Sequence, residues 1–301
     1  MNAISITILS IILMIGLGYF LKRIDFLSED AVDPLNKIVM YILLPCMIFS
    51  AISTADLSLL PKLGILPLVI LSSSIITGII SYFLLRKLGL DDITLWSVLV
   101  TIMIANTGFM GYPISLGVYG QEGFLRAIFC DIATLCIFLI LSYILVLKFG
   151  GNKEDAIKKI LLFPTLWAII LGMGINFSNI SIGPVLENTI NYLGQGTIPL
   201  IMLVLGLSIN FEGISRSKSM IAFTSIMKLV FFPAVAFLIA SCIGLADLQF
   251  KVSVVEAAMP SGMMSLLLAI TYNLDFELKS DCIFINTVIS LITLPVIMML
   301  L

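Results

Sequence analysis

The segment IANTGFMGYPISLGVYG, residues 104–120, is the part of this sequence that decides the fold. It lies inside an uncharged run from Ile93 to Gln121, which is long enough to cross a bilayer. Near its middle the run contains a group of residues that interrupts a helix: Asn106, Thr107, Gly108, Gly111 and Pro113. Unpaired backbone groups are costly in hydrocarbon, so a broken membrane helix is tolerated only inside protein or beside water. The segment therefore predicts a polar cavity near mid-membrane; the alternative is a proline kink that only shapes helix packing.

The composition indicates a polytopic membrane protein. Of the 301 residues, 60% are hydrophobic and only 11% are charged, far more apolar surface than a soluble domain needs. A net charge of -2 and the lack of a basic patch argue against nucleic-acid binding. All five cysteines lie in apolar runs without a CxxC pair, so neither a disulfide framework nor a metal site is expected.

The apolar runs predict an all-α membrane protein with ten spans. Their approximate bounds are 3–21, 35–54, 63–85, 93–119, 124–147, 159–178, 187–208, 219–243, 251–272 and 279–300. The longest hydrophilic connection, Lys148 to Lys159, separates two halves of five spans each, residues 1–150 and 151–301. Because five is an odd number, the two halves are expected to have opposite orientations in the membrane.

Basic residues predict the orientation, because they concentrate in cytoplasmic loops. Twelve lie in loops on one side: Lys22, Arg23, Lys37, Arg86, Lys87, Lys148, Lys153, Lys158, Lys159, Arg216, Lys218 and Lys279. The opposite loops carry Lys62, Arg126 and Lys251. The first side is therefore expected to be cytoplasmic, with both termini outside the cell membrane and the first span retained rather than cleaved.

This orientation can be tested by chemical labelling. A cysteine introduced between Gly151 and Asp155, in a background without the native cysteines, is expected to react only with reagents that reach the cytoplasm. Labelling by an impermeant reagent from outside intact cells would reverse the assignment.

Interrupted spans occur at corresponding places in the two halves. Pro45 lies in the middle of the second span and Pro199 in a similar place in the seventh. The fourth span is expected to break at Asn106 to Pro113, and the ninth at Met259 to Gly262. Paired breaks of this kind indicate an inverted-repeat transporter whose binding site lies between two discontinuous helices.

Glu256 lies one helical turn before Pro260, and a carboxylate at that depth usually faces a cavity or a partner. Its expected role is to bind a cation, carry a proton or contact substrate; the alternative is a residue near the outer helix end that reaches water or pairs with Lys251. Asp131 is either functional or a structural contact, and Lys228 is expected to extend to the cytoplasmic face or pair with a carboxylate. Several uncharged polar residues are expected to form interhelical hydrogen bonds: Asn176, Gln195, Thr197, Asn286 and Thr287.

Catalytic motifs are missing from the sequence. Without histidine there is neither an HExxH site nor a histidine-based triad, and the nucleotide-binding patterns GxGxxG and GxxxxGK[ST] do not occur. An enzyme, including an intramembrane one, is therefore not expected, nor is transport driven by the protein's own ATP hydrolysis.

Three stretches of the sequence resemble the auxin efflux carrier family, which includes plant PIN carriers and many prokaryotic transporters. They are ANTGFMGYPISLGVYG, VVEAAMPSGMMSLLLAITYN and GYFLKRIDFLSEDAVDPLNKIVMYILLPCMIFS. The most specific is the family's NT-x-x-MG-x-P pattern, matched from Asn106 to Pro113. The resemblance extends over nearly the whole chain.

The resemblance implies a ten-helix inverted-repeat fold similar to that of sodium–bile acid symporters. Helices 1, 2, 6 and 7 would form a scaffold domain, and helices 3–5 and 8–10 a transport domain in which broken helices 4 and 9 cross. Asn106 matches the asparagine that contacts the substrate carboxylate, and Pro113 and Pro260 match the two crossover prolines. Two features depart from PIN carriers: the connection between helices 5 and 6 is short, and Glu256 stands where PIN carriers have glutamine, similar to the sodium-site glutamate of the symporters.

The expected function is carriage of a small organic anion, such as an auxin-like compound or a dicarboxylate, by secondary active or facilitative alternating access. The alternative is a membrane receptor or sensor that binds the ligand without moving it. The expected substrate site comprises Asn106, Thr107, Gly108, Gly111, Pro113, Met259, Pro260, Ser261 and Gly262. Glu256, with Asn106 and Thr107, is the expected ion-coupling site, with sodium and the proton both left open. No other cofactor is expected, and a homodimer would form through the scaffold domain.

Overall fold

The computed structural model describes residues 3–150, 163–209 and 217–301. Within these ranges every regular element is a helix, and one isolated antiparallel bridge joins Ala105 to Ser261. Seven helical stretches are long and apolar enough to cross a membrane: Ile4–Arg23, Glu29–Ser53, Leu60–Lys87, Thr107–Phe149, Pro184–Leu207, Lys218–Cys242 and Phe276–Leu300. Two shorter apolar helices, Asp92–Met103 and Pro164–Phe177, accompany them. The prediction of an all-α chain with many apolar spans is confirmed.

The ten predicted spans exceed the seven observed candidates for identifiable reasons. Predicted spans 93–119 and 251–272 are each divided by an irregular break. Spans 93–119 and 124–147 also share one helix, α7 (Tyr112–Phe149), which is kinked at Gly120 (φ 66°). Span 159–178 begins outside the described residues, as does the Gly151–Asp155 segment of the labelling test. Ten membrane passes and the orientation of the termini remain predictions.

Contacts group the chain into two compact units. Unit 1 comprises Met1–Leu60, Leu116–Leu125 and Lys159–Phe211. Unit 2 comprises Pro61–Ser115, Arg126–Lys158 and Glu212–Leu301. Each unit draws on both halves of the sequence, whereas the two predicted repeats are consecutive. The repeats and the scaffold and transport domains remain predictions.

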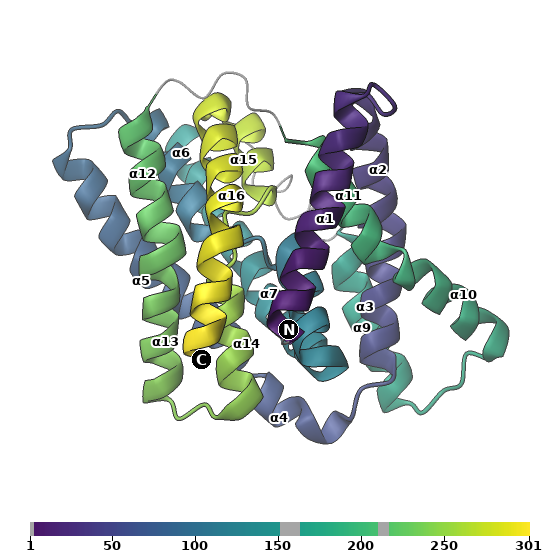
Figure 1. Cartoon of the computed structure of the whole chain (residues 1–301). Helices are drawn as coiled ribbons and strands as arrows, with labels where there is room; N and C mark the ends of the chain where they lie inside the picture. Colours follow the sequence, from purple (N-terminus) through teal and green to yellow (C-terminus); the bar gives the residue numbers. More distant parts are fainter. Residues whose placement is uncertain (1–2, 151–162, 210–216) are drawn as a thin grey trace. The chain divides into compact units, whose positions relative to one another are not determined.

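Unit 1 contains helices from both halves of the sequence. Its elements are α1 (Ala3–Arg23), η1 (Glu29–Ala31), α2 (Val32–Ile38), η2 (Val39–Leu43), α3 (Leu44–Ser53), η3 (Leu57–Leu59), α9 (Pro164–Phe177), α10 (Pro184–Gln195) and α11 (Thr197–Leu207). Helix α1 packs along α11, and α3 packs against α9 and α10 (Figure 1). Asn176 of α9 donates to the carbonyls of Ile52 and Ala55 at 2.7 and 2.8 Å, an interhelical hydrogen bond of the predicted kind.

Two glycines allow the close contact between α1 and α11. A Cβ at Gly206 would lie 2.1 Å from the Ile15 carbonyl oxygen, and a Cβ at Gly18 would lie 2.2 Å from that of Leu203. Small residues let membrane helices approach backbone to backbone, where van der Waals contact drives their association. The close contact between α1 and α11 therefore depends on the absence of side chains at Gly18 and Gly206.

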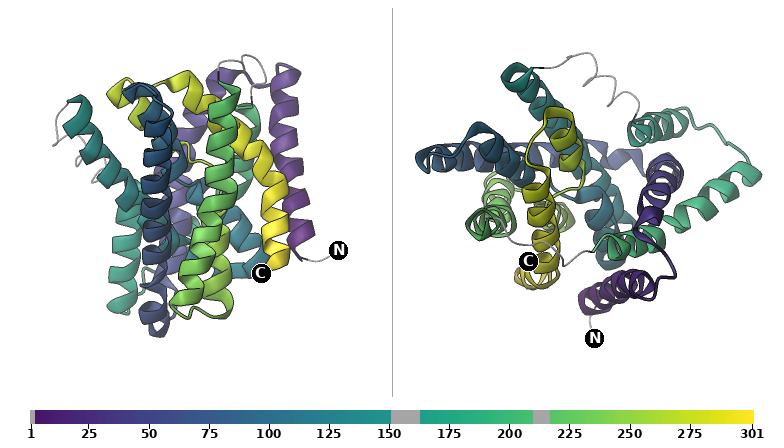
Figure 2. Two further views of the ribbon diagram at one scale, coloured as in Figure 1. Left: turned by 90° about the vertical axis from the view of Figure 1, so that its left-hand side faces the viewer. Right: turned by 90° about the horizontal axis from the view of Figure 1, so that it is seen from above.

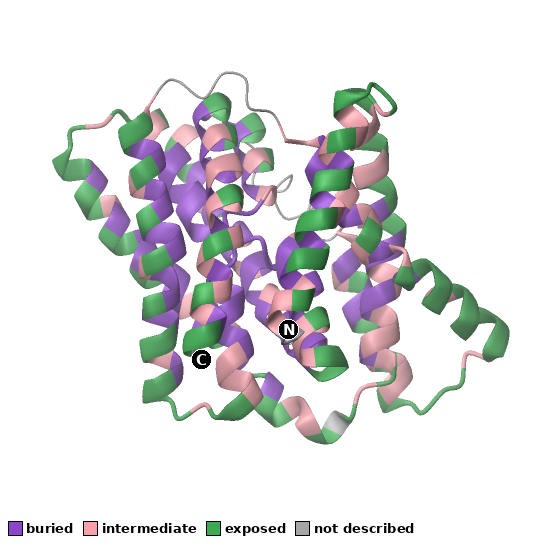
Figure 3. Cartoon of the chain, viewed as in Figure 1, coloured by how far each residue is buried: buried purple, intermediate pink, exposed green. Residues whose placement is uncertain are grey.

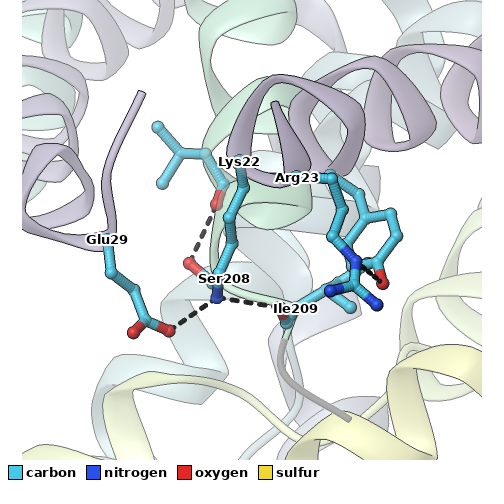
Figure 4. A network of polar contacts seen from close by, with 7 residues as sticks. Lys22, Arg23, Glu29, Ser208 and Ile209 are labelled. Atoms are coloured by element: carbon cyan, nitrogen blue, oxygen red, sulfur yellow. Dashed lines mark hydrogen bonds and ion pairs between the residues drawn. The ribbon is translucent and has the colours of Figure 1, made fainter. Parts of the chain in front are cut away.

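Lys22 connects the ends of α1 and α11 that are predicted to face the cytoplasm. Its Nζ donates to the Glu29 carboxylate at 2.6 Å and to the Ile209 carbonyl at 3.1 Å (Figure 4). Ile209 follows Ser208, the C-cap of α11, so the ammonium satisfies a carbonyl just beyond the helix end, where cations are favoured. Lys22 thus has a structural role inside unit 1.

Unit 2 contains the two broken helices. Its elements are α5 (Leu66–Lys87), α6 (Asp92–Met103), η4 (Thr107–Gly111), most of α7, α12 (Lys218–Ile226), η5 (Met227–Phe231), α13 (Phe232–Cys242), α14 (Asp247–Ala257), α15 (Met264–Tyr272) and α16 (Phe276–Leu300); the short helix α4 (Leu60–Leu63) precedes α5. Helices α12, η5 and α13 follow one another without interruption (Figure 2). Helix α12 packs against α16, and α13 packs against α5 and α14.

Three prolines are accommodated by π-helical turns. The turns η2, η4 and η5 each end two residues before a proline, namely Pro45, Pro113 and Pro233. A proline ring clashes with the carbonyl four residues earlier in an α-helix, and a π-turn relieves this by inserting one extra residue. The helix therefore continues through Pro45, where the sequence predicts an interruption.

Burial separates the interior of unit 2 from its outer surfaces. The breaks that follow α6 and α14 are buried, whereas α5, α12 and α16 carry exposed residues (Figure 3). Large apolar side chains are prominent among the exposed ones, such as Phe83, Ile226 and Ile292. Water does not favour such surfaces, but the tails of a lipid bilayer do.

Candidate functional site

Two extended segments cross in the interior of unit 2. The Asn106 amide donates to the Pro260 carbonyl at 2.8 Å, and the Gly262 amide donates to the Ile104 carbonyl at 2.8 Å. Ala105 and Ser261, which are bridged, lie between these two hydrogen bonds. Each break therefore satisfies backbone groups that the other break has freed from its helix, which removes much of the cost of breaking a helix in the membrane interior.

The first break is shorter than the sequence predicts. The prediction places it across Asn106 to Pro113, but the backbone leaves the helical conformation only from Ile104 to Asn106. Thr107, Gly108 and Gly111 lie in the π-turn η4, and Pro113 lies in the first turn of α7. Proline is tolerated there because the preceding π-turn η4 relieves the clash of its ring with the preceding turn. The second break, Met259 to Gly262, lies where the sequence places it.

Asn106 has an incompletely used side chain at the crossing. The residue is 4% exposed, and its backbone carbonyl accepts from the amides of Met110 and Gly111 at 3.2 Å. Its side-chain Nδ2 has no hydrogen-bond partner among the described residues. A buried donor without a partner is costly, so Nδ2 is a group that a bound acceptor would complete.

Glu256 is fully buried beside the other break. Its Oε1 accepts a hydrogen bond from Ser115 at 2.7 Å, while Oε2 has no partner in the part of the chain that the structure describes. Oε2 lies against Gly111, where a Cβ would come within 2.0 Å of it. The carboxyl group thus faces inward, and the alternative in which it pairs with Lys251 near the helix end is wrong for this structure.

A second carboxyl group lies near η4. Asp131 of α7 accepts hydrogen bonds from the Thr107 hydroxyl and, at 2.8 Å, from the Tyr112 hydroxyl. The Thr107 hydroxyl is also 3.1 Å from that of Thr134. Thr107, which the sequence analysis assigns to substrate or ion binding, therefore already contacts a protein carboxylate.

The second break is held by uncharged polar groups. The Asn286 amide of α16 donates to the Ser261 hydroxyl at 2.9 Å, and Ser225 of α12 donates to the Asn286 Oδ1 at 2.6 Å. Asn286 thus forms the interhelical hydrogen bonds predicted for it. Pro260, Ser261 and Met259 are all buried.

Two lysines also lie in the interior of unit 2. Lys228 and Lys279 are each 0% exposed, and their Nζ atoms contact the carbonyls of Ala257 at 3.4 Å and Ser265 at 2.6 Å. The prediction that Lys228 extends to the cytoplasmic face is wrong, because its ammonium is enclosed by protein. The sequence also assigns Lys279 to a cytoplasmic loop, whereas it lies in the first turns of α16.

Unit 1 holds a polar cavity of about 640 Å³. Ser50, Asn191 and Gln195 line it, and the Ser50 hydroxyl donates to the Asn191 Oδ1 at 2.6 Å. Its lining includes the carboxylates of Asp56 and Glu122, and none of its described lining residues is lysine or arginine. The crossing in unit 2 differs in having a buried donor without a partner among the described residues, Asn106 Nδ2, which makes it the better candidate for binding an anion.

The structure adds residues that the sequence analysis did not single out. Ser115 is the partner of Glu256, and Tyr112 and Thr134 belong to the network around Asp131. Their only sequence signal is that polar groups lie in an apolar span, a signal they share with many residues that bond to their own helix, such as Thr101 and Ser241. Their partners depend on helix packing, which periodicity does not specify.

Crossed, broken helices inside an apolar helical chain define an integral membrane protein built like a carrier. The chain belongs to the auxin efflux carrier family: the sequence model of that family, described as "Membrane transport protein", matches residues 3–298. It is therefore a multi-pass membrane transporter, and members of this family are not enzymes.

Individual relatives cover most of the chain or a little under half of it. An uncharacterized transporter of Methanothermobacter thermautotrophicus is 36% identical over 289 residues, covering 96% of this chain and 95% of the relative. A putative malonate transporter of Rhizobium meliloti is 21% identical over 291 residues, 93% of this chain and 90% of the relative. An auxin efflux carrier component of Arabidopsis thaliana is 28% identical over 142 residues, 45% of this chain and 39% of the relative.

Proposed function

We propose that this transporter carries a small organic anion bearing a carboxylate, by alternating access. The observation that supports the site most directly is Asn106 Nδ2, a buried donor without a partner among the described residues, at the crossing of two broken helices. A carboxylate oxygen is a suitable acceptor for it. Helix N-termini follow both breaks, at η4 with α7 and at α15, and their partial positive charge favours an anion.

The proposed substrate site comprises the residues of the two breaks and the turns after them: Asn106, Thr107, Gly108, Gly111, Pro113, Met259, Pro260, Ser261 and Gly262. The printed names of two relatives agree with this ligand class, since one is a putative malonate transporter and malonate is a dicarboxylate, and another is an auxin efflux carrier. Malonate is accordingly the first ligand to test.

The proposed architecture is a ten-helix inverted repeat in the cell membrane with both termini outside. The exchanged hydrogen bonds about Ala105 and Ser261 support it, because two inverted halves would place equivalent segments around a local two-fold axis. The transport domain, helices 3–5 and 8–10, would move relative to the scaffold of helices 1, 2, 6 and 7, and the scaffold would form the homodimer.

The proposed function is tested by uptake of radiolabelled malonate into proteoliposomes that contain the purified protein. We expect saturable accumulation that unlabelled malonate inhibits and that the uncharged diamide of malonate does not. A sensor would instead show saturable binding without accumulation inside the vesicles. Protein that neither binds nor accumulates any small carboxylate would contradict the proposal.

Glu256 is the proposed ion-coupling residue, together with Asn106 and Thr107, and sodium is favoured slightly over the proton. Hard cations prefer oxygen ligands, and Oε2 of Glu256 is a buried carboxyl oxygen without a partner among the described residues. If sodium binds there, malonate affinity should rise with sodium at fixed pH, and Glu256→Gln should flatten that dependence. If a proton binds there, affinity should follow pH instead, and the same substitution should remove the pH dependence.

The matched control for this experiment is Glu122→Gln, which removes a carboxylate from the lining of the unit 1 cavity. It should leave both dependences as they are in the unmodified protein. Malonate affinity that is independent of both sodium and pH in the unmodified protein would rule out ion coupling through Glu256.

A further inference from the structure

Lys228 is a buried cation without a close counter-ion. Its Nζ lies 3.6 Å from the centroid of the Phe232 ring and 3.4 Å from the Ala257 carbonyl oxygen. Within the described ranges, none of the ion pairs closer than 4.0 Å involves it. An ammonium group has three donors, and here one carbonyl is within reach, at the long end of hydrogen-bond distances. The contacts of Lys228 therefore compensate little of the cost of burying its charge.

Lys228 lies close to the crossing. Ala257 is the last residue of α14, and three residues further on the Pro260 carbonyl accepts from the Asn106 amide. Three residues of chain span at most about 11 Å. The ammonium is therefore within roughly 14 Å of the Pro260 carbonyl, in the break where the proposed substrate site lies and in an interior where charges are only weakly screened.

Lys279 differs from Lys228 although it is equally buried. Its Nζ donates to the Ser265 carbonyl at 2.6 Å, a short hydrogen bond to a neighbouring helix. Lys279 therefore has a sufficient structural role in joining α16 to α15. Lys228 forms no comparable bond, and methionine would fill the same space without an uncompensated charge.

Two carboxyl groups also lie at the crossing. Glu256 of α14 lies against Gly111 of η4. Asp131 of α7 contacts Thr107 of η4 and the adjoining Tyr112. Both carboxyl groups would oppose an incoming anion when ionised. A fixed positive charge nearby counteracts this repulsion, and its attraction for the ligand grows with the negative charge of the ligand.

We propose that Lys228 sets the charge preference of the transported anion, favouring doubly charged carboxylates over singly charged ones. The proposal rests on the anion transport proposed above and assigns its substrate class to dianions. Coulomb energy is linear in ligand charge, so a fixed cation strengthens binding of a dianion by the square of the factor for a monoanion. At about 12 Å and an effective dielectric constant near 20, that factor is roughly tenfold per unit of ligand charge.

The test compares malonate with monomethyl malonate, which has the same skeleton and one charge. Affinities are measured by isothermal titration at constant ionic strength for the unmodified protein, Lys228→Met, Lys228→Arg and the control Lys22→Met. We expect Lys228→Met to weaken malonate about 100-fold and monomethyl malonate about tenfold, so that the preference for the dianion falls about tenfold. Lys228→Arg should retain the preference. Lys22→Met removes a cation that pairs with Glu29 in unit 1, so it should lower thermal stability and leave the ratio of the two affinities unchanged.

Folding of each variant is checked by size-exclusion chromatography. If Lys228→Met does not fold, Lys228→Gln removes the same charge while keeping a donor for the Ala257 carbonyl. A folded neutral variant with an unaltered ratio would overturn the role of Lys228 and leave the proposed function standing. Failure of the unmodified protein to bind either anion would refute the proposed function, and this inference with it.

Discussion

Asn106→Ala should weaken carboxylate binding by about 10- to 150-fold, the equivalent of losing a hydrogen bond to a charged group worth roughly 1.5–3 kcal/mol. The reason is that Nδ2 is buried at the crossing with no partner among the described residues, so the ligand is the acceptor that completes it. Asn106→Asp should weaken binding further, because it replaces a donor with a group of the same charge as the ligand. Equilibrium binding of malonate to the purified variants measures both effects.

Asn176→Ala is the matched control, since it removes the same side chain from unit 1. The Asn176 amide donates to two backbone carbonyls of that unit, so its loss should lower stability without changing malonate affinity. Folded Asn106→Ala protein with unchanged affinity would remove Asn106 from the site. An equal loss of affinity in Asn176→Ala would show that the effect is one of general stability.

Gly206→Ala should lower the free energy of unfolding by about 1–3 kcal/mol, the usual range for overpacking a tight contact. The added Cβ would lie 2.1 Å from the Ile15 carbonyl oxygen, which is backbone, so a side-chain rotation cannot relieve the clash. Helices α1 and α11 would have to separate. The midpoint of thermal unfolding in detergent should therefore fall.

Gly16→Ala provides the comparison on the same helix pair. Nothing lies within 4 Å of a Cβ at Gly16, and alanine is favoured over glycine inside a helix by roughly 0.5–1 kcal/mol. This variant should be neutral or slightly more stable. If the midpoint for Gly206→Ala matches that of Gly16→Ala, the α1–α11 contact is looser than the structure shows.

The sequence was informative where the chemistry is local. Asparagine, glycine and proline in apolar spans predicted both breaks, and the second break lies at Met259–Gly262 as expected. The first break was overestimated, because local preferences do not reveal that Pro113 follows a π-turn and lies in the first turn of a helix. The interruption expected at Pro45 is absent for the same reason, because Pro45 follows the π-turn η2 and lies in the first turn of α3.

Features that depend on contacts between distant segments could not be predicted. The sequence analysis interpreted Gly111 as a helix breaker. In the structure its missing side chain makes room for Glu256, a residue far away in the sequence. The sequence analysis expected Lys228 to extend to the membrane surface. Its actual depth depends on the helices packed around it, which the sequence does not specify. Asn286 was assigned correctly as a hydrogen-bonding residue, whereas its partners Ser225 and Ser261 required the fold.

The bridge between Ala105 and Ser261 also constrains the biosynthesis of this protein. The Asn106 amide and the Ile104 carbonyl emerge from the ribosome 156 residues before the segment with which they pair. Throughout that interval the first break has no backbone partner of its own, and hydrocarbon penalises such groups heavily. The nascent first half must therefore keep this segment near water, or covered by the insertion machinery, until the ninth predicted span arrives. Integration into the bilayer and the final folding step are thereby coupled.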